Sequence, residues 1–567
     1  MPIIYNQKSL NKDEYKDYIN VSTGNVKADL VLKNVTYLDV FTNRFKKGNV
    51  AISHGMFSGI GDYQGKKEID LTGKTIVPGF VDSHIHIEST TVVPEIFAKE
   101  ALRHGTTAVF TDPHEIANVM GVDGIKYVIE SSKNLPLDIF FMIPSCVPSC
   151  EYDESGAQIL MKDIEPFYDN ERVFGLAEVM DFNGVISRRE AVIDKTYSAI
   201  KNNMVIDGHA PLLSGKSLNG YTSAGISSDH ECSNLEEALE KIGLGLWIII
   251  REGTAAQNLE ALIRLCKEPY ASRCMFCTDD RHINNLMDEG HIDNIIRKAI
   301  KLGAEPAVAY KMASYTAGIY FGLNKRGAIA PGYLANFVVL NDVNTVEIDS
   351  VYKCGIRITE EYLNENCKSN IPAYLKEKAH DTFHMPVITA EMLANKEETP
   401  VLGLVERQLI TTNKGRAKAI DVSSDILKVV VVERHKNTGH IGVGFIKGYG
   451  LKKGAVATSV AHDAHNIIAV GASEEEIAIA INELKNIGGG MLVYSDGKIQ
   501  ASYALPVAGL MSETNAEDAK KCLDEIHKSA YELGVNKGID PFMTLSFTAL
   551  PVIPELRITT YGIIEIK

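Results

Sequence analysis

The sequence has 567 residues, too many for one hydrophobic core, so we expect two to four domains. The 58 lysines and arginines against 73 aspartates and glutamates give a net charge of -15, which argues against binding nucleic acid as a polyanion. The N-terminus lacks the basic start and apolar core of a signal peptide, and no apolar run approaches the roughly 20 residues that span a bilayer. The nine cysteines are scattered, as in reduced proteins. We therefore predict a cytoplasmic protein without nucleic-acid or membrane partners.

Two segments, one near the start of the chain and one near its middle, share a pattern of short strands and turns. It occurs in "ADLVLKNVTYLDV" and "KEIDLTGKTIVPGF" near the start and returns in "GAIAPGYLANFVVLND". We predict that residues 1–75 and 325–384 form a small β-sandwich domain together with a bridging segment.

Between these two segments, strands alternate with helices, which predicts a parallel sheet. The eight predicted strands are "IVPGFVDSHIH", "TTAVFTD", "LDIFFMIPS", "VFGLAEVM", "MVIDGHA", "AGISSDH", "GLWIII" and "CMFCTDD". Helical stretches such as "VVPEIFAKEALRHG" and "NLEEALEKIG" separate most of them. Eight units over about 250 residues match a (β/α)₈ TIM-like barrel, which we place at residues 76–324.

The last third of the chain combines strands and helices in a different order. The strands include "ILKVVVVERH" and "GMLVYSD", and the helices include "SEEEIAIAINELKNIG" and "AEDAKKCLDEIHKSAYELG". We predict an additional α+β domain at residues 385–567, so the whole chain is of the α/β class.

Metal-competent side chains stand at the ends of several predicted barrel strands. His84 and His86 are two residues apart, so a strand presents both on one face, which is the lumen of a barrel. The ends of the fourth, fifth, sixth and eighth strands carry Glu178, His209, His230 and Asp279. Four histidines and two carboxylates suit a pair of divalent transition-metal ions, with Glu178 able to bridge them.

Several motifs in the chain resemble those of a known protein superfamily and of one family within it. "GFVDSHIH" and "TAGIYFGLNKRGAIAPGYLANFVVLND" resemble the first strand and the exit segment of the amidohydrolase superfamily. The fourth strand offers Glu178 and no lysine, unlike the hydantoinases and many dihydroorotases, which carry a carboxylated lysine there. The chain most resembles the bacterial and archaeal adenine deaminase family, in "HIHIEST", "TDPHEIANVMG", "AEVMDFNGV", "DGHAPLLSGKSLNGY" and "FCTDDRH".

The resemblance implies metal-dependent hydrolysis of adenine to hypoxanthine and ammonia. In that reaction a hydroxide supplied by the metal ions attacks C6 of the purine, and Asp279 takes its proton as both ligand and base. An acid must then face the ring nitrogen that gains electron density. Glu88 is our first candidate, because it lies two residues beyond His86; Glu115 and Asp280 are alternatives. A structural role for Glu88 at the start of the next helix stays open.

Several further polar residues have open roles at this stage. His114 follows the second strand and either orients a ligand, contacts the substrate or has no role. Asp207 and Asp229 stand near ligand histidines and either hold them or bond loop backbone. The stretch "LLSGKSLNGYTSAG" is interpreted as a lid or specificity loop, unless its glycines serve only turns.

A second histidine pair lies late in the chain, in "ATSVAHDAHNIIAV". We interpret "HDAHN" as a turn between two strands, with too few ligands for a separate metal site. Two interpretations remain: a solvent-exposed turn, or a tip that places His462 and His465 over the barrel mouth. The resemblance favours the tip, because adenine deaminases carry a similar segment.

Three points stay open in sequence alone. The resemblance points to Mn²⁺ or Fe²⁺, although imidazole and carboxylate ligands also suit Zn²⁺. It also implies a homodimer or larger homo-oligomer. The alternative functions are hydrolysis of a cyclic amide on the same scaffold, and, more remotely, a non-catalytic scaffold protein.

Overall fold

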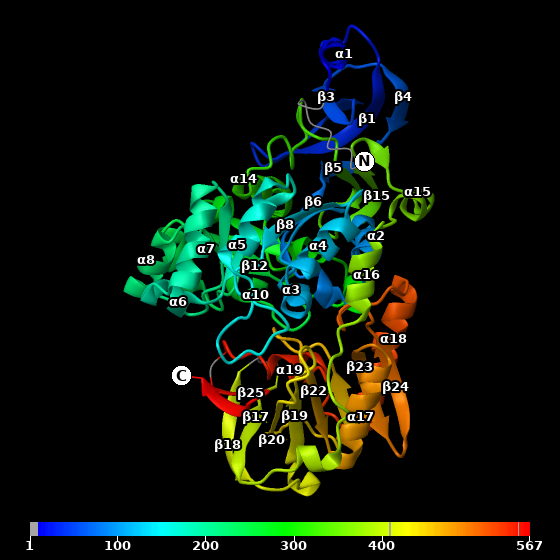
Figure 1. Cartoon of the computed structure of the whole chain (residues 1–567). Helices are drawn as coiled ribbons and strands as arrows, with labels where there is room; N and C mark the ends of the chain where they lie inside the picture. The colour runs from blue at the N-terminus through cyan, green and yellow to red at the C-terminus, as the bar shows by residue number, and fades with distance from the viewer. Residues whose placement is uncertain (1–9, 407–409, 554, 567) are drawn as a thin grey trace.

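The computed structural model describes residues 10–406, 410–553 and 555–566. Figure 1 shows a β domain with the N-terminal strands at one end, a layered strand-and-helix body in the middle, and the C-terminal part at the other end. Within the described ranges, none of the helices has the length and apolarity needed to cross a membrane.

The central body is a barrel of eight parallel strands, as predicted. Its strands are β6 (Phe80–Ile85), β7 (Thr106–Thr111), β8 (Asp138–Ile143), β9 (Val173–Val179), β10 (Val205–Gly208), β11 (Ser228–Asp229), β12 (Trp247–Arg251) and β13 (Cys274–Cys277). They pair in two parallel runs, β6 to β10 and β11 to β13. Backbone hydrogen bonds join the runs at both seams, from Ser227 N to Ile206 O at 3.0 Å and from Asp279 N to His84 O at 3.0 Å. The second seam brings the ends of the first and eighth strands together.

Helices cover the outside of these strands. They are α2 (Pro94–Arg103), α3 (His114–Met120), α4 (Val122–Ser131), α5 (Met161–Ile164), α6 (Phe182–Ser187), α7 (Glu190–Lys201), α8 (Gly215–Ser223), α9 (Leu235–Gly243), α10 (Leu259–Leu262), α11 (Ile283–Glu289), α12 (Ile292–Lys301), α13 (Pro306–Lys311) and α14 (Ala317–Tyr320). Helix α8 corrects the interpretation of its segment as a loop. Leu218 and Tyr221, three residues apart, are both completely buried, and this apolar face outweighs the cost of a glycine within the helix.

The two flanks of the barrel meet in one sheet, as predicted. Helix α1 (Lys12–Ser22) precedes β1 (Ala28–Asp39), β2 (Arg44–Ser53), β3 (Met56–Ile60), β4 (Gly65–Asp70) and β5 (Thr75–Pro78), and β14 (Phe337–Asp342), β15 (Glu347–Lys353) and β16 (Ile356–Arg357) follow the barrel. The order is β16-β15-β14-β5-β1-β2-β3, with β4 also on β1. Strands β5 and β14 pair antiparallel, which joins the beginning and end of this half. The domain boundaries given above stay a prediction.

The C-terminal part has its own eight-stranded sheet. After α15 (Glu360–Asn366) and α16 (Ala373–His380) come β17 (Thr399–Leu404), β18 (Thr411–Ala417), β19 (Leu427–Val432), β20 (Ile441–Lys447), β21 (Ala455–Thr458), β22 (Ile467–Gly471), α17 (Glu474–Asn486), β23 (Gly490–Ser495), β24 (Lys498–Ala504), α18 (Ala516–Glu532), α19 (Met543–Phe547), β25 (Glu555–Thr559) and β26 (Gly562–Ile566). The sheet order is β18-β17-β20-β19-β22-β21-β23-β24, and β25 pairs with β26.

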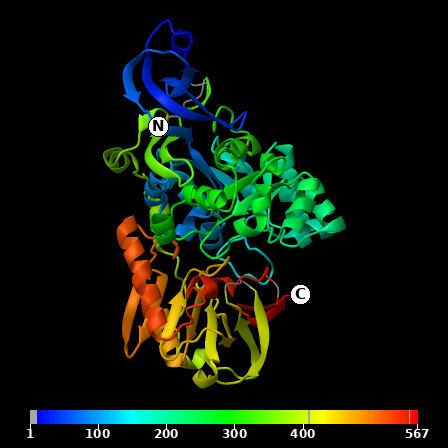
Figure 2. The same cartoon turned by 180° about the vertical axis from the view of Figure 1, so that it is seen from behind.

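The C-terminal part lies against the barrel on the side away from the N-terminal β domain, as the view from behind also shows (Figure 2). Backbone hydrogen bonds link Ser512 N to Thr91 O at 2.8 Å and Val93 N to Ser512 O at 3.1 Å. One apolar cluster includes Val93 of the barrel and Val507 of the C-terminal part. The loop between β21 and β22 therefore faces the barrel's strand ends.

Candidate metal centre

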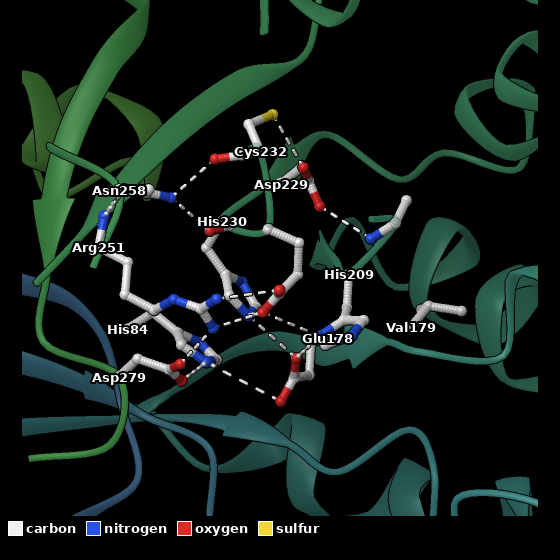
Figure 3. A network of polar contacts seen from close by, with 12 residues as sticks. His84, Glu178, Val179, His209, Asp229, His230, Cys232, Arg251, Asn258 and Asp279 are labelled. Carbon is white, nitrogen blue, oxygen red and sulfur yellow. Dashed lines mark hydrogen bonds and ion pairs between the residues drawn. The ribbon is translucent and has the colours of Figure 1, made fainter. Parts of the chain in front are cut away.

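The six side chains predicted as metal ligands converge at the ends of the barrel strands. We call this group the strand-end cluster; it consists of His84, His86, Glu178, His209, His230 and Asp279. Figure 3 shows five of them pointing toward one another from separate strand ends. All are buried except His209, whose side chain is 17% exposed.

His84, His86 and Asp279 form one side of the cluster. The Nε2 atoms of the two histidines lie 3.2 Å apart, and Oδ1 of Asp279 lies 3.3 Å from the first and 3.1 Å from the second. Nδ1 of His86 lies 2.9 Å from the carbonyl oxygen of Asp112. Because a carbonyl only accepts, Nδ1 carries the proton, and the Nε2 atom of neutral His86 offers its lone pair to the cluster.

Glu178 connects this side to the other two histidines. Its Oε1 lies 3.5 Å from Nε2 of His86, while its Oε2 lies 2.8 Å from Nδ1 of His209 and 3.2 Å from Nε2 of His230. One carboxylate thus faces nitrogen atoms from both sides with separate oxygens, which is the arrangement of a bridging ligand.

The donor set fits divalent cations. Burial opposes charge throughout the cluster, yet hydrogen bonds from His209 and His230 hold the pKa of Glu178 well below its usual range. Burial likewise opposes ionisation of Asp279, but the Arg251 guanidinium and the cluster histidines hold its pKa well below normal. The carboxylates are therefore ionised, and the cluster attracts positive charge.

Two charged residues beside the cluster, Arg251 and Glu231, were not predicted from the sequence. Nη1 of Arg251 lies 2.6 Å from Oδ2 of Asp279 and also contacts Oε1 of Glu231, whose Oε2 lies 3.0 Å from Nη2. Glu231 in turn lies 3.3 Å from Nε2 of His230. Glu231 directly follows the predicted ligand His230, and this position in the sequence could have identified it. Arg251 ends an apolar strand and carries no sequence signal for a role at the cluster.

His114 also lies against the cluster. Asp207 and Asp229, which were considered as groups that hold ligand histidines, do not contact them. Nδ1 of His114 lies 3.0 Å from Asp112 Oδ2 and 3.5 Å from Glu178 Oε1. Asp229 accepts from the backbone of Ala210 at 2.8 Å and from the buried Lys241, so it organises a loop and does not hold His230. Asp207 accepts from hydroxyl groups of Ser228 and Tyr320 instead of His209.

Comparison with known proteins places this geometry in a family. The amidohydrolase family model matches residues 75–358, and the adenine deaminase C-terminal domain model matches residues 404–567. An adenine deaminase of Clostridium acetobutylicum is 43% identical, over 97% of this chain and 98% of the relative. One of Dehalococcoides mccartyi is 44% identical over 97% of both chains, and one of Oceanobacillus iheyensis is 41% identical over 98% and 97%.

The chain belongs to the adenine deaminase family. Its amidohydrolase part implies a divalent metal centre, and the strand-end cluster supplies a matching donor set. The C-terminal domain typical of the adenine deaminase family contains the late histidine pair.

The late histidine pair is buried at the barrel mouth in this member of the adenine deaminase family. His462 is 4% exposed and His465 is completely buried, so the segment is not a solvent-exposed turn. Asp463 Oδ1 lies 3.7 Å from Nε2 of His114, and Nε2 of His465 lies 3.5 Å from Oε2 of Glu115. The C-terminal domain therefore closes over side chains that border the cluster.

The three predicted acid candidates lie close together near Ser89. Oγ of Ser89 lies 2.6 Å from both Glu115 Oε1 and Asp280 Oδ1. A hydroxyl has one proton to donate, so Ser89 donates to one of these two carboxyl groups at a time. The two groups therefore lie within reach of one hydroxyl, one residue from Asp279 in the case of Asp280.

Glu88 does not continue the strand face of His86. The strand ends at Ile85, and residues 87–90 form a 3₁₀ turn. Oε1 of Glu88 accepts from Ile116 N at 3.2 Å, in the first turn of α3, while its Oε2 is buried without a partner among the described residues. It does not cap the following helix α2, whose N-cap Val93 has no side-chain bond. Burial and the neighbouring Glu115 raise the pKa of Glu88 to about 8.

Proposed function

We propose that the protein hydrolyses adenine to hypoxanthine and ammonia with divalent metal ions held by the strand-end cluster. The observation that carries the proposal is the complete set of six converging ligand side chains in a chain that matches named adenine deaminases along almost its full length. Adenine is neutral, which agrees with a net negative chain that need not attract an anion.

The cluster divides into two sets of ligands around Glu178. His84, His86 and Asp279 would hold one ion, His209 and His230 would hold the other, and Glu178 would join them. Such ions lower the pKa of water and so supply a nucleophile at neutral pH. We propose Mn²⁺ or Fe²⁺, with Zn²⁺ as the alternative, because imidazole and carboxylate ligands suit all three.

Asp279 is proposed to move the proton of the attacking water. Its Oδ1 faces the histidines of the cluster, and its Oδ2 is held by Arg251 at 2.6 Å, so the carboxylate is fixed in one orientation. An ionised carboxylate in this position accepts a proton as the oxygen attacks C6 and returns it to the departing amine.

The proton for the purine ring comes from the carboxyl groups beside Asp279. We keep Glu88 as the first candidate, because its Oε2 is buried and has no partner within the described residues. Glu115 and Asp280 are the alternatives, because both lie 2.6 Å from the Ser89 hydroxyl. Replacing each by its amide (Glu88→Gln, Glu115→Gln, Asp280→Asn) and comparing kcat separates the three.

Ammonia release by the metal-loaded protein tests the function. We expect turnover of adenine and none of dihydroorotate or hydantoins; the opposite pattern would identify a cyclic amide hydrolase. The Asp279→Asn variant should lose at least about a hundredfold in kcat, the lower end of general-base contributions. Full activity in that variant would contradict the proposed role, and an inactive wild type with bound metal would contradict the function. The predicted homodimer or larger assembly is checked separately by light scattering.

A further inference from the structure

Five of the six side chains of the strand-end cluster are buried and the sixth, His209, is only 17% exposed, so a substrate needs a route to the cluster. A cleft of about 730 Å³ lies between the barrel and the C-terminal domain, with Asn285 of α11 on one wall and Asp524 and Tyr531 of α18 on the other. This volume is within the usual range for small-molecule pockets. Its position above the ends of the barrel strands is where ligands of such barrels bind.

A second, smaller pocket lies between this cleft and the cluster. It is bordered by Ser89 of the barrel and by His462, Phe542 and Ser546 of the C-terminal domain. Ser89 bonds Asp280, the neighbour of Asp279, so this inner pocket borders the reacting region. It offers about 10 Å³, room for roughly one water molecule, so binding a purine requires it to widen.

His282 is the residue that lines both the cleft and the inner pocket. Its backbone is fixed, because its N–H donates to Thr254 Oγ1 at 2.9 Å and its carbonyl accepts from Leu286 at 3.0 Å. Its side chain is 4% exposed, and its ring makes no hydrogen bond within the part of the chain that the structure describes. The two ring nitrogens are not among the buried polar atoms that lack a partner, so they are accessible from the pockets that His282 lines and are free to bind a ligand.

The chemistry of His282 suits a neutral heterocyclic base. Burial and the nearby His527 lower the pKa of His282 to about 4, although Asp540 opposes this, so the ring is neutral at pH 7. A neutral imidazole offers one donor and one acceptor, as the edge of a purine does. Phe542 and His462, which stacks on Phe547 at 4.6 Å between ring centroids, give the inner pocket aromatic walls.

We infer that the purine reaches the cluster through the cleft between α11 and α18, and that His282 binds the purine edge at the boundary of cleft and inner pocket. This inference rests on the proposed function for the identity of the base. It adds a substrate-contacting residue and a direction of access. Neither could be predicted from a local sequence pattern, although His282 ends the motif "FCTDDRH".

Variants of His282 test the contact. Loss of one neutral hydrogen bond corresponds to about a tenfold change in binding. We expect His282→Ala to raise KM for adenine and the Kd for unsubstituted purine, which has no amine to lose, by about tenfold each. Metal content should be unchanged, and His282→Gln, which keeps a donor and an acceptor, should recover part of the loss. His384→Ala is the matched control, because His384 lines a separate cleft of about 580 Å³. Unchanged KM and Kd in His282→Ala would overturn the contact.

Cross-linking tests the route. Asn284 Nδ2 and Asp524 Oδ1 lie 3.3 Å apart across the proposed cleft. Lys378 Nζ and Asp123 Oδ2 lie 2.5 Å apart at the separate cleft that His384 lines. In a Cys150→Ser, Cys522→Ser background, cysteine pairs at 284/524 and at 123/378 are joined with a reducible cross-linker. We expect kcat/KM to fall at least tenfold for the 284/524 link, to recover on reduction, and to stay unchanged for the 123/378 link. Full activity of the linked 284/524 protein, or a block by the other link, would overturn the route.

The proposed function and this inference fail in different ways. If the wild type does not release ammonia from adenine, the proposed function is wrong. The contact of His282 can still be tested in that case, by comparing the Kd for purine of the wild type with that of His282→Ala. If the wild type is active and His282→Ala and the 284/524 link have no effect, only this inference fails.

Discussion

Nε2 of His465 lies 3.5 Å from Oε2 of Glu115, and both side chains are completely buried between the C-terminal domain and the barrel. The backbone N–H of Ala461 points to Nδ1 of His465 at 3.3 Å, so Nδ1 is the acceptor and Nε2 carries the proton of the neutral ring. The N–H at Nε2 therefore faces Glu115, although the two atoms are not hydrogen-bonded. We expect His465 to position this carboxyl group, because a protonated nitrogen does not bind a metal ion.

Replacing His465 should lower turnover without loss of metal. His465→Ala removes the side chain that faces Oε2 of Glu115 at 3.5 Å, so this buried carboxyl group is no longer held in place. We expect kcat to fall by about tenfold or more while metal content per chain stays at the wild-type value. His465→Asn is the matched variant, because asparagine tolerates the φ of +54° and keeps a donor. Equal loss of metal and activity would instead assign His465 to the metal site.

Removing Arg251 should weaken the metal centre from outside it. Arg251 neutralises Asp279 and Glu231, so Arg251→Met leaves two neighbouring carboxylates without their counter-charge. We expect metal affinity or kcat/KM to fall by about 10–100-fold, as for other groups that orient ligands. Arg273→Met, which removes a cation packed on Trp247 at the start of the strand that ends in Arg251, should have no effect. Metal titration monitored by activity distinguishes the two variants.

Metal removal should abolish activity reversibly. The cluster side chains are held by several strands, so the barrel should stay folded when a chelator takes the ions. We expect activity to return on adding Mn²⁺ or Fe²⁺ to the wild type. Glu178→Gln should regain little, because an amide cannot bridge two cations with two anionic oxygens. Circular dichroism before and after chelation verifies the fold, and chelator-resistant activity in protein proven free of metal would contradict the mechanism.

The buried Asp153 should make stability depend on pH. Burial and the neighbouring Asp463 raise the pKa of Asp153 to about 7, whereas an unfolded aspartate titrates near 3.9. Between these values the folded protein binds the extra proton, so this group's contribution to stability falls as pH rises and is fully lost above about pH 7.

The Asp153→Asn variant has no such proton to lose. We expect its Tm, relative to that of the wild type, to rise steadily from pH 5 to pH 7 and then to level off at pH 8. Thermal unfolding of both proteins in matched buffers measures this difference. A difference that is constant across the range would show that Asp153 does not titrate there.

The barrel and the strand-end cluster could be predicted from the sequence because local patterns encode them. Alternating apolar strands predict the barrel, and a strand's two-residue repeat puts His84 and His86 on one face. The position of Arg251 could not be predicted, because its partners come from two other strand ends and no spacing links them. Helix α8 was missed because burial of Leu218 and Tyr221, visible only after folding, outweighs the glycine and serine signals. The contact of His465 with Glu115 joins residues 350 positions apart, beyond the reach of any local pattern.

The pairing of β5 with β14 sets an order for events during protein synthesis. Strand β5 can pair with β1 as soon as it is made, but its other edge stays unpaired until residues 337–340 have left the ribosome, after the whole barrel has been made. The loop that carries His465 emerges later still. A nascent chain can therefore assemble the strand-end cluster before its cover exists, and loading of metal from solution is easiest in that interval.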